Sequence, residues 1–445
     1  MSTIWIPRQV RAGARVRSRV DAVTLLSCYV FLIMIIPAWL VFSPFEGAGQ
    51  PSTIFALILF AWYLATWLHP RTAPAARQPV RLGIIVFGCA VIAAYVSASR
   101  TAMAQTVTDG ANRGLISLAG WAGVLLLAAD GIDSLDRLRS LLRRVVLCAT
   151  AMAVLAITQF FTGLNAVQHL TIPGLVSWDD TTTDVLSRYE LNRVAATTLH
   201  PIELAVVLAL ALPFAIHQAR YSPPEHRGWR WSQVALIGAA LPVTISKTAV
   251  VAAAAVAIVL LPSWPRRDRL IGCAVIGAAG LITWEGIPSL FHAFRSLIGG
   301  AATSSSTASR TDAFSSAAPF IARHPWLGMG FGTFNPQVYF YTDDQYLLTL
   351  IEIGVIGLLA LMILFGSGWM SARRARHASA DPETRDLAQC LAAAIAVSVA
   401  SFATFDALTF PVAAGLTFFM IGCAGAMLRL VASPASVRPG RVGST

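Results

Sequence analysis

Twelve apolar runs of 15 to 24 residues recur along the 445-residue chain. Runs of roughly 17–25 residues match a helix that crosses a hydrocarbon layer about 30 Å thick. Lipid admits only helices and closed barrels, and the chain lacks the roughly 10-residue alternating segments of a barrel. Charged residues make up only 12% of the chain, against about 25% in soluble proteins. The sequence therefore predicts an all-α polytopic membrane protein.

We expect about 12 transmembrane helices. The predicted crossings lie near residues 23–43, 52–68, 82–98, 114–129, 145–162, 201–218, 232–246, 249–263, 269–286, 347–370, 387–403 and 408–429. The seventh and eighth runs are short and nearly continuous. An eleven-helix arrangement or a broken helical hairpin is therefore an alternative for that part of the chain.

These crossings divide the chain into three parts. A basic cytoplasmic arm covers residues 1–22, a single transmembrane domain covers 23–430, and a cytoplasmic tail covers 431–445. Two extracytoplasmic loops within the domain are long, at about 163–200 and 287–346. All other outward connections are short, so these two loops are the places where a site can be built outside the membrane.

The second long loop is predicted to contain short helices. Residues 291–298 form a candidate interfacial helix, and a Gly/Ala/Ser/Thr run at 299–309 follows as a flexible link. Apolar residues at helical spacing predict a short amphipathic helix within about 311–323. Pro319 is expected to kink that helix or to end it early.

Positive charge follows the predicted topology. The formal net charge is +11, and with the N-terminus inside, 25 of the 33 Lys and Arg residues lie in segments facing the cytoplasm. This positive-inside bias predicts a multi-pass protein of the inner or plasma membrane with both termini cytoplasmic. The basic charge is thus topological, so we expect membrane lipids and no nucleic acid as partners.

A run of motifs distinguishes the second long loop and the helix after it. Arg310 comes first, followed by HPWLGMGFGTF at 324–334, the pair Asp343-Asp344, and EIGVIG at 352–357. This order resembles the signature of the O-antigen ligase/polymerase superfamily, which comprises polytopic GT-C-type membrane glycosyltransferases. The resemblance covers roughly residues 190–360 in recognisable motifs and the whole chain in topology.

The resemblance implies a metal-independent, inverting transfer of a glycan on the extracytoplasmic face. The donor would be a glycan on a polyprenyl-diphosphate carrier, and the acceptor a lipid, a glycan or a protein. A ligase of the O-antigen kind is expected, with a polysaccharide polymerase of the same superfamily as the alternative. A transporter or flippase is the alternative from another class. The chain carries no metal or nucleotide motif, so no cofactor is expected.

Transfer from a diphosphate requires cations that stabilise the leaving group. Arg193, Lys247 and Arg310 are the best candidates among the outward-facing cations, and Arg188 is another without a matching motif. Lys247, the only lysine, stands where the superfamily has an arginine, which keeps the charge but loses the bidentate fork. Alternatively, Lys247 only extends toward water and Arg310 only faces solvent.

A carboxylate is the candidate base. Asp343 stands where many superfamily members carry a histidine, and it would accept the proton of the acceptor hydroxyl. Asp343 and Asp344 would equally suit the start of a helix. Glu352, inside an apolar helix, is either functional or a structural partner of a cation. His200 and His324 are further candidates, more typical of a helix start and of a shaped turn than of catalysis.

Overall fold

The computed structural model of the protein describes most of the chain. The described residues are 21–43, 49–67, 78–100, 105–165, 167, 170–178, 186–188, 191–286, 305–336 and 338–432. Most of the arm expected at 1–22 and of the tail expected at 431–445 lies outside them. The interfacial helix expected at 291–298 and the first part of the flexible link expected at 299–309 also lie outside the described residues.

Helices account for most of the described structure. They are α1 (Ala22–Ile35), α2 (Pro51–Trp67), α3 (Pro79–Ala98), α4 (Gln105–Gly131), α5 (Leu135–Thr162), α6 (Pro201–Arg220), α7 (Pro224–Val243), α8 (Lys247–Leu260), α9 (Arg266–Gly286), α11 (Ser305–Arg323), α12 (Gln345–Ala378), α13 (Pro382–Phe402) and α14 (Pro411–Ala432). Each of the twelve predicted crossings overlaps one of them, and α11 lies in the second long loop. Seven helices of the described chain are long and apolar enough to cross a membrane, and α1, α2 and α8 are shorter apolar helices. The chain is therefore an all-α, multi-pass membrane protein, as predicted.

Among the described residues, short strands occur only in the connections between helices. β1 (Leu40–Val41) pairs antiparallel with β2 (Val176–Ser177), and β3 (Leu186–Arg188) pairs antiparallel with β4 (Leu191–Arg193). The first pair ties the α1–α2 connection to the first long loop. The second forms a hairpin just before α6.

Several helix ends differ from the prediction for local reasons. The first apolar run does not stay helical to residue 43, because Pro37 follows α1 and the chain then extends into β1. α4 and α5 begin about ten residues earlier than expected, since their first turns are polar and escape a search for apolar runs. Ser134 caps α5 by accepting the backbone N–H of Arg137 at 3.4 Å. Ile245, in the left-handed region at φ 44°, separates α7 from α8 as two helices.

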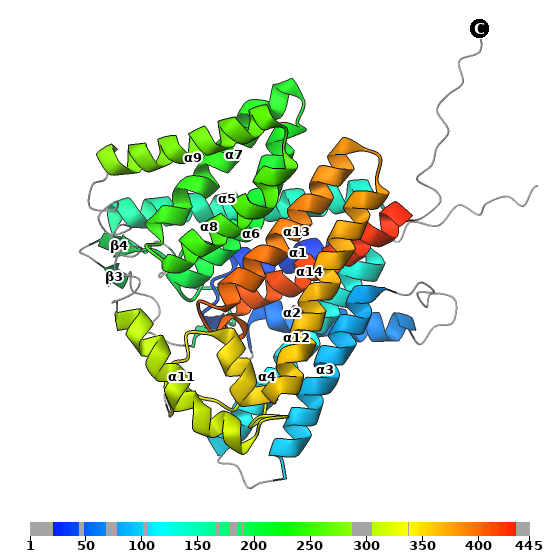
Figure 1. Cartoon of the computed structure of the whole chain (residues 1–445), viewed down its shortest axis with the longest axis vertical. Coiled ribbons are helices and arrows are strands. Elements are labelled where there is room, and N and C mark those ends of the chain that lie inside the picture. The colour runs from blue at the N-terminus through cyan, green and yellow to red at the C-terminus, as the bar shows by residue number, and fades with distance from the viewer. Residues whose placement is uncertain are drawn as a thin grey trace, which may run out of the picture.

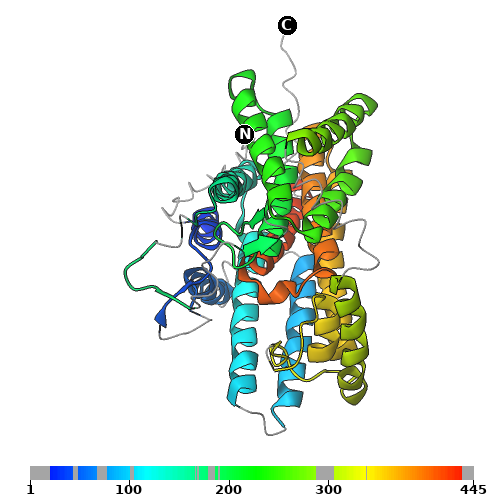
Figure 2. The same cartoon turned by 90° about the vertical axis from the view of Figure 1, so that its left-hand side faces the viewer.

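The helices pack around α14, which is almost wholly buried. α14 contacts α4, α12 and α13, while α13 also packs on α6 and α8, and α12 packs on α3. Figure 1 shows α7, α8 and α9 on one side of this centre and α3 and α4 on the other. In Figure 2, α1, α2 and α5 are seen along one flank of the bundle.

The two ends of the bundle carry different polar groups. We call the end at which α6, α8, α12 and α14 begin the outward end, and the end at which α6, α12 and α14 finish the inward end. Ion pairs lie at the inward end, where Arg220 bonds Asp386 at 3.1 Å and Asp268 at 2.8 Å, and Arg81 bonds Asp130 at 2.9 Å. These positions agree with the side that the positive-inside bias predicts to be cytoplasmic.

Candidate functional site

A break inside α12 shapes the outward end of the bundle. Gly354 has φ 69° and ψ −167°, so α12 consists of a short limb before it and a long limb after it, both visible in Figure 1. The loop 324–334 fills the break. The N–H of Val355 donates to the carbonyl of Pro325 at 2.9 Å, and the N–H of Gly330 donates to the carbonyl of Glu352 at 2.8 Å. Backbone groups released by the break therefore find partners in the loop.

The glycines of the two motifs are required on both sides of this contact. Gly328, Gly330 and Gly332 all have positive φ, between 64° and 111°. A Cβ on Gly328 would lie 2.3 Å from the carbonyl carbon of Glu352, and one on Gly354 would lie 2.4 Å from that of Trp326. Only glycine permits both the conformation and the approach. HPxxGxGxGxF and ExGxxG are thus the two halves of one packed contact.

Replacing Gly354 by Ala should lower the melting temperature of the detergent-purified protein. The left-handed conformation alone costs a non-glycine residue about 1–3 kcal/mol, and the added Cβ also meets backbone that cannot move aside. Gly366 is the matched control, because it lies in the same helix and a Cβ there has no neighbour within 4 Å. Gly366→Ala should leave the melting temperature unchanged or raise it. Equal melting temperatures for the two variants would contradict the packing role of Gly354.

Glu352 fastens the same loop. Its side chain is buried, and its Oε1 accepts the backbone N–H of Phe334 at 3.2 Å. The carboxylate therefore holds the last residue of the HPxxGxGxGxF segment from the short limb of α12. His324 is exposed where the chain leaves α11, and Phe320 accepts its backbone N–H at 3.3 Å.

α11 differs from the predicted short helix. It begins at Ser305, so Arg310 lies within the helix and not before it. Pro319 neither ends the helix early nor stops it from reaching Arg323. Ala313 and Ala317 of α11 are buried in one apolar cluster with residues of the short limb of α12. Arg310 therefore belongs, one turn before Ala313, to a helix anchored on the broken helix.

Arg193 and Lys247 approach the outward end from different segments. Arg193 is the last residue of β4, and its Nε donates to the carbonyl of Thr244 at 3.3 Å. Thr244 lies in the connection between α7 and α8, and Lys247 begins α8 directly after the capping residue Ser246. The structure thus brings Arg193 to the junction that carries Lys247. Arg188 lies in β3, the other strand of the hairpin.

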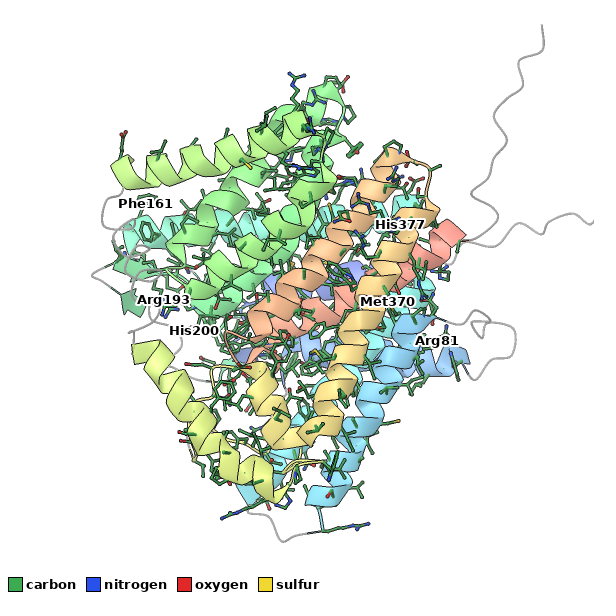
Figure 3. The ribbon with its side chains drawn as sticks, viewed as in Figure 1. Arg81, Phe161, Arg193, His200, Met370 and His377 are labelled. Carbon is green, nitrogen blue, oxygen red and sulfur yellow. The ribbon has the colours of Figure 1, made fainter. Side chains whose placement is uncertain are left out.

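His200 caps α6. Its Nδ1 accepts the backbone N–H of Ile202 at 3.2 Å. Burial, with the nearby charge of Arg193, lowers the pKa of His200 to about 4, so the ring is neutral near pH 7 and carries its proton on Nε2. Figure 3 shows Arg193 and His200 together on one side of the bundle, with Arg81 and His377 on the other.

The acidic pair begins α12. The Oδ1 of Asp344 accepts the N–H of Tyr346 at 2.8 Å and that of Leu347 at 3.2 Å, so Asp344 is the N-cap. Asp343 precedes it with φ 48°, in the left-handed region that few residues other than glycine adopt. The sequence left two interpretations open for this pair, a catalytic base and a helix cap. The structure shows that Asp344 is the helix cap. Asp343 is left as the partly buried carboxylate at the helix start.

Asp406 is a member of this site that the sequence analysis missed. It lies in the α13–α14 connection and is 7% exposed. Its Oδ1 accepts the hydroxyl of Thr342 and the backbone N–H of Asp344, the latter at 3.1 Å. Burial, with the negative charges of Asp343 and Asp344, raises the pKa of Asp406 to about 6. The signal in the sequence is a single acidic residue in a short connection between two apolar runs.

Further contacts join these segments at the outward end. The hydroxyl of Thr248 in α8 donates to the Oγ1 of Thr404 at 2.9 Å, and the rings of His200 and Phe410 are 6.1 Å apart. The first turns of α6 and α8 therefore meet the α13–α14 connection, which is also bonded to the start of α12. The N-terminal end of a helix carries partial positive charge. Together with Arg193 and Lys247, this arrangement favours a multiply charged anion beside a carboxylate.

A group of three potential metal ligands lies at the inward end. Atoms of His217, Asp386 and Cys390 fall within 4.8 Å of one another. The Nδ1 of His217 is already 2.7 Å from one oxygen of Asp386, and Arg220 donates to the other at 3.1 Å. These contacts describe a hydrogen-bonded ion cluster, and it is remote from the site at the outward end.

Comparison with known proteins finds a family match for one segment of the chain. The family described as O-Antigen ligase matches residues 233–362, less than a third of the sequence. No curated protein matches the chain. The matched segment contains Lys247 and Asp343, whereas Arg193, His200 and Asp406 lie outside it. The resemblance to the O-antigen ligase/polymerase superfamily is confirmed, and it supports glycan transfer of the ligase or polymerase type in general.

Proposed function

Since the chain is O-antigen ligase-like over residues 233–362, we propose that it transfers a glycan from a polyprenyl-diphosphate carrier to an acceptor at the outward end. The observation that carries this proposal is the junction of four helix N-termini with two cations and a carboxylate. A lipid-linked donor reaches such a place from within the membrane, while the acceptor reaches it from the aqueous side. Both termini are then cytoplasmic.

Arg193, Lys247 and Arg310 hold the diphosphate in this proposal. Arg193 and Lys247 are supported by their approach to the α7–α8 junction, where the N-terminal end of α8 adds partial positive charge. Arg310 is supported by its place in α11, which packs on the short limb of α12. Their positive charge stabilises the diphosphate as it leaves, which is the role that a metal ion has in other glycosyl transfers. Transfer is therefore independent of metal.

Asp343 accepts the proton of the acceptor hydroxyl. The hydroxyl oxygen forms a bond to the anomeric carbon on the face opposite the diphosphate, and the bond from that carbon to the diphosphate oxygen breaks with its electron pair. The product is inverted at the anomeric carbon, the proton stays on the Asp343 carboxylate, and polyprenyl diphosphate is released. Asp343 is supported by its partial exposure beside the junction and by the capping role that occupies Asp344.

A ligase that passes a glycan to a separate acceptor is the form we favour, with polymerase as the alternative within the same chemistry. A transporter would share one feature with this structure, the broken helix α12. The break is, however, filled by the backbone of the loop 324–334, and the candidate charges gather at one end of the bundle. These two observations favour transfer over transport.

Purified protein should release polyprenyl diphosphate from the lipid-linked glycan of its host, with a suitable acceptor and EDTA present. The measurement is the amount of free polyprenyl diphosphate together with the size of the glycan product. One added block indicates a ligase, and a ladder of repeats indicates a polymerase. Folded protein that releases no polyprenyl diphosphate would overturn the proposal, and activity that EDTA abolishes would overturn its metal independence.

A further inference from the structure

One carboxylate oxygen holds the chain on both sides of Asp343. The Oδ1 of Asp406 accepts the side-chain hydroxyl of Thr342, the residue before Asp343, and the backbone N–H of Asp344, the residue after it. Thr342 is 1% exposed and Asp406 is 7% exposed, so water does not compete for these bonds. Asp343 itself makes neither bond, and its side chain is partly exposed.

The two bonds that Asp406 accepts from Thr342 and Asp344, which we call the bracket, account for the backbone conformation of Asp343. At φ 48°, Asp343 is one of three residues of the described chain, glycines aside, with positive φ. Such a conformation persists only where the surroundings impose it. Here its neighbours are fixed to the same atom, and the cap of α12 by Asp344 fixes the following turn. The carboxylate of Asp343 is thus presented from a backbone that cannot relax.

We propose that Asp406 is a positioning residue that holds the Asp343 carboxylate in its reactive orientation, an inference that rests on the proposed role of Asp343 as base. Asp406 reaches this position from the α13–α14 connection, outside the O-antigen ligase-like segment. It acts by accepting hydrogen bonds, and it does not itself touch the substrate. An uncharged side chain with an oxygen in the same place should therefore serve as well.

The first test compares Asp406→Asn with Asp406→Ala in the release assay. Asn keeps an oxygen that accepts both bonds, so its kcat should remain within about threefold of the wild type. Ala removes both bonds, and its kcat should fall about 10- to 100-fold, the usual effect of a small misplacement of a reacting group. The KM for the lipid-linked donor should be unchanged in both, because the diphosphate is held elsewhere.

The chain offers a matched control at the inward end. Asp381 caps α13 and accepts two bonds from Thr384, at 2.9 Å from its N–H and 2.5 Å from its hydroxyl. Asp381→Ala and Thr384→Val remove the same kinds of bond far from the site, and they should leave kcat unchanged. Melting temperatures of all variants in detergent show whether any loss of activity reflects unfolding.

A second variant tests the same hydrogen bonding in case the Asp406→Ala protein does not fold. Thr342→Val removes one bond of the bracket without changing the shape of the side chain, and it should also lower kcat at constant donor KM, whereas Thr342→Ser should restore it. In an Asp343→Asn background, Asp406→Ala should cause no further loss.

Full activity of Asp406→Ala and Thr342→Val, with Asp343→Asn inactive, would overturn the positioning role alone. Full activity of Asp343→Asn would overturn the proposed base instead.

Discussion

Arg310→Ala should lower the rate of polyprenyl diphosphate release by about 100- to 1,000-fold, the effect of removing one charged group from a developing anion in a water-poor site. The expected cause is loss of the positive charge that stabilises the leaving diphosphate, so kcat should fall. Arg310→Lys keeps the charge and loses the bidentate fork, so its rate should lie between those of wild type and Ala. Single-turnover release by purified protein is the measurement.

Arg100 provides the control for Arg310. It is exposed just after the end of α3, on the side predicted to face outward, and it belongs to none of the superfamily motifs. Arg100→Ala should release polyprenyl diphosphate at the wild-type rate. If Arg310→Ala melts like the wild type and is equally active, Arg310 does not hold the diphosphate. Arg193 and Lys247 would then be the remaining candidates for binding the diphosphate. Their Ala variants are tested in the same assay.

Asp343→Asn should lower kcat by about 100- to 10,000-fold, the usual contribution of a positioned general base. Asn tolerates the left-handed conformation that this position requires and has nearly the same shape, so the fold should be retained. Only the capacity to take a proton is lost. Binding of the lipid-linked donor should remain, and it can be measured directly with the inactive variant.

Two other helix-capping carboxylates, one beside Asp343 and one far from it, show whether this effect belongs to Asp343. Asp344→Asn keeps the N-cap of α12, because Asn caps helices as well as Asp, and should retain most of the activity. Asp381→Asn makes the same change at the cap of α13 and should be silent. If Asp344→Asn were the inactive variant and Asp343→Asn the active one, the base would be Asp344.

The all-α class of the chain and the order of its apolar helices were predictable from the sequence, because an apolar run in lipid must satisfy its backbone polar groups within a helix. The helix ends were less predictable, since caps such as Ser134 and polar first turns leave no trace in an apolar run. The glycines of 324–334 were found because the superfamily motifs contain them. Lys247 and Asp343 were found because they stand at motif positions where the superfamily has an arginine and a histidine. The roles assigned to Lys247 and Asp343 stay predictions.

Two features of the site depend on contacts between distant segments and were missed. The sequence showed Gly354 within an apolar run that a single helical crossing accounts for, and only the docked loop explains why α12 breaks there. Asp406 stands 62 residues from Asp344, whose N–H it accepts. Nothing in the local pattern around Asp406 points to that partner, although a lone carboxylate beside a membrane helix is a reason to look for one.

The bracket around Asp343 has a consequence for exchanging parts between related proteins. A chimera that receives only the O-antigen ligase-like segment would carry Lys247, Asp343 and the break in α12 at Gly354. Its host would still have to supply the oxygen of Asp406, the cap at His200 and the cation at Arg193. We therefore expect that the matched segment alone does not transfer activity, and that donor specificity follows only when the segments before and after it are exchanged together.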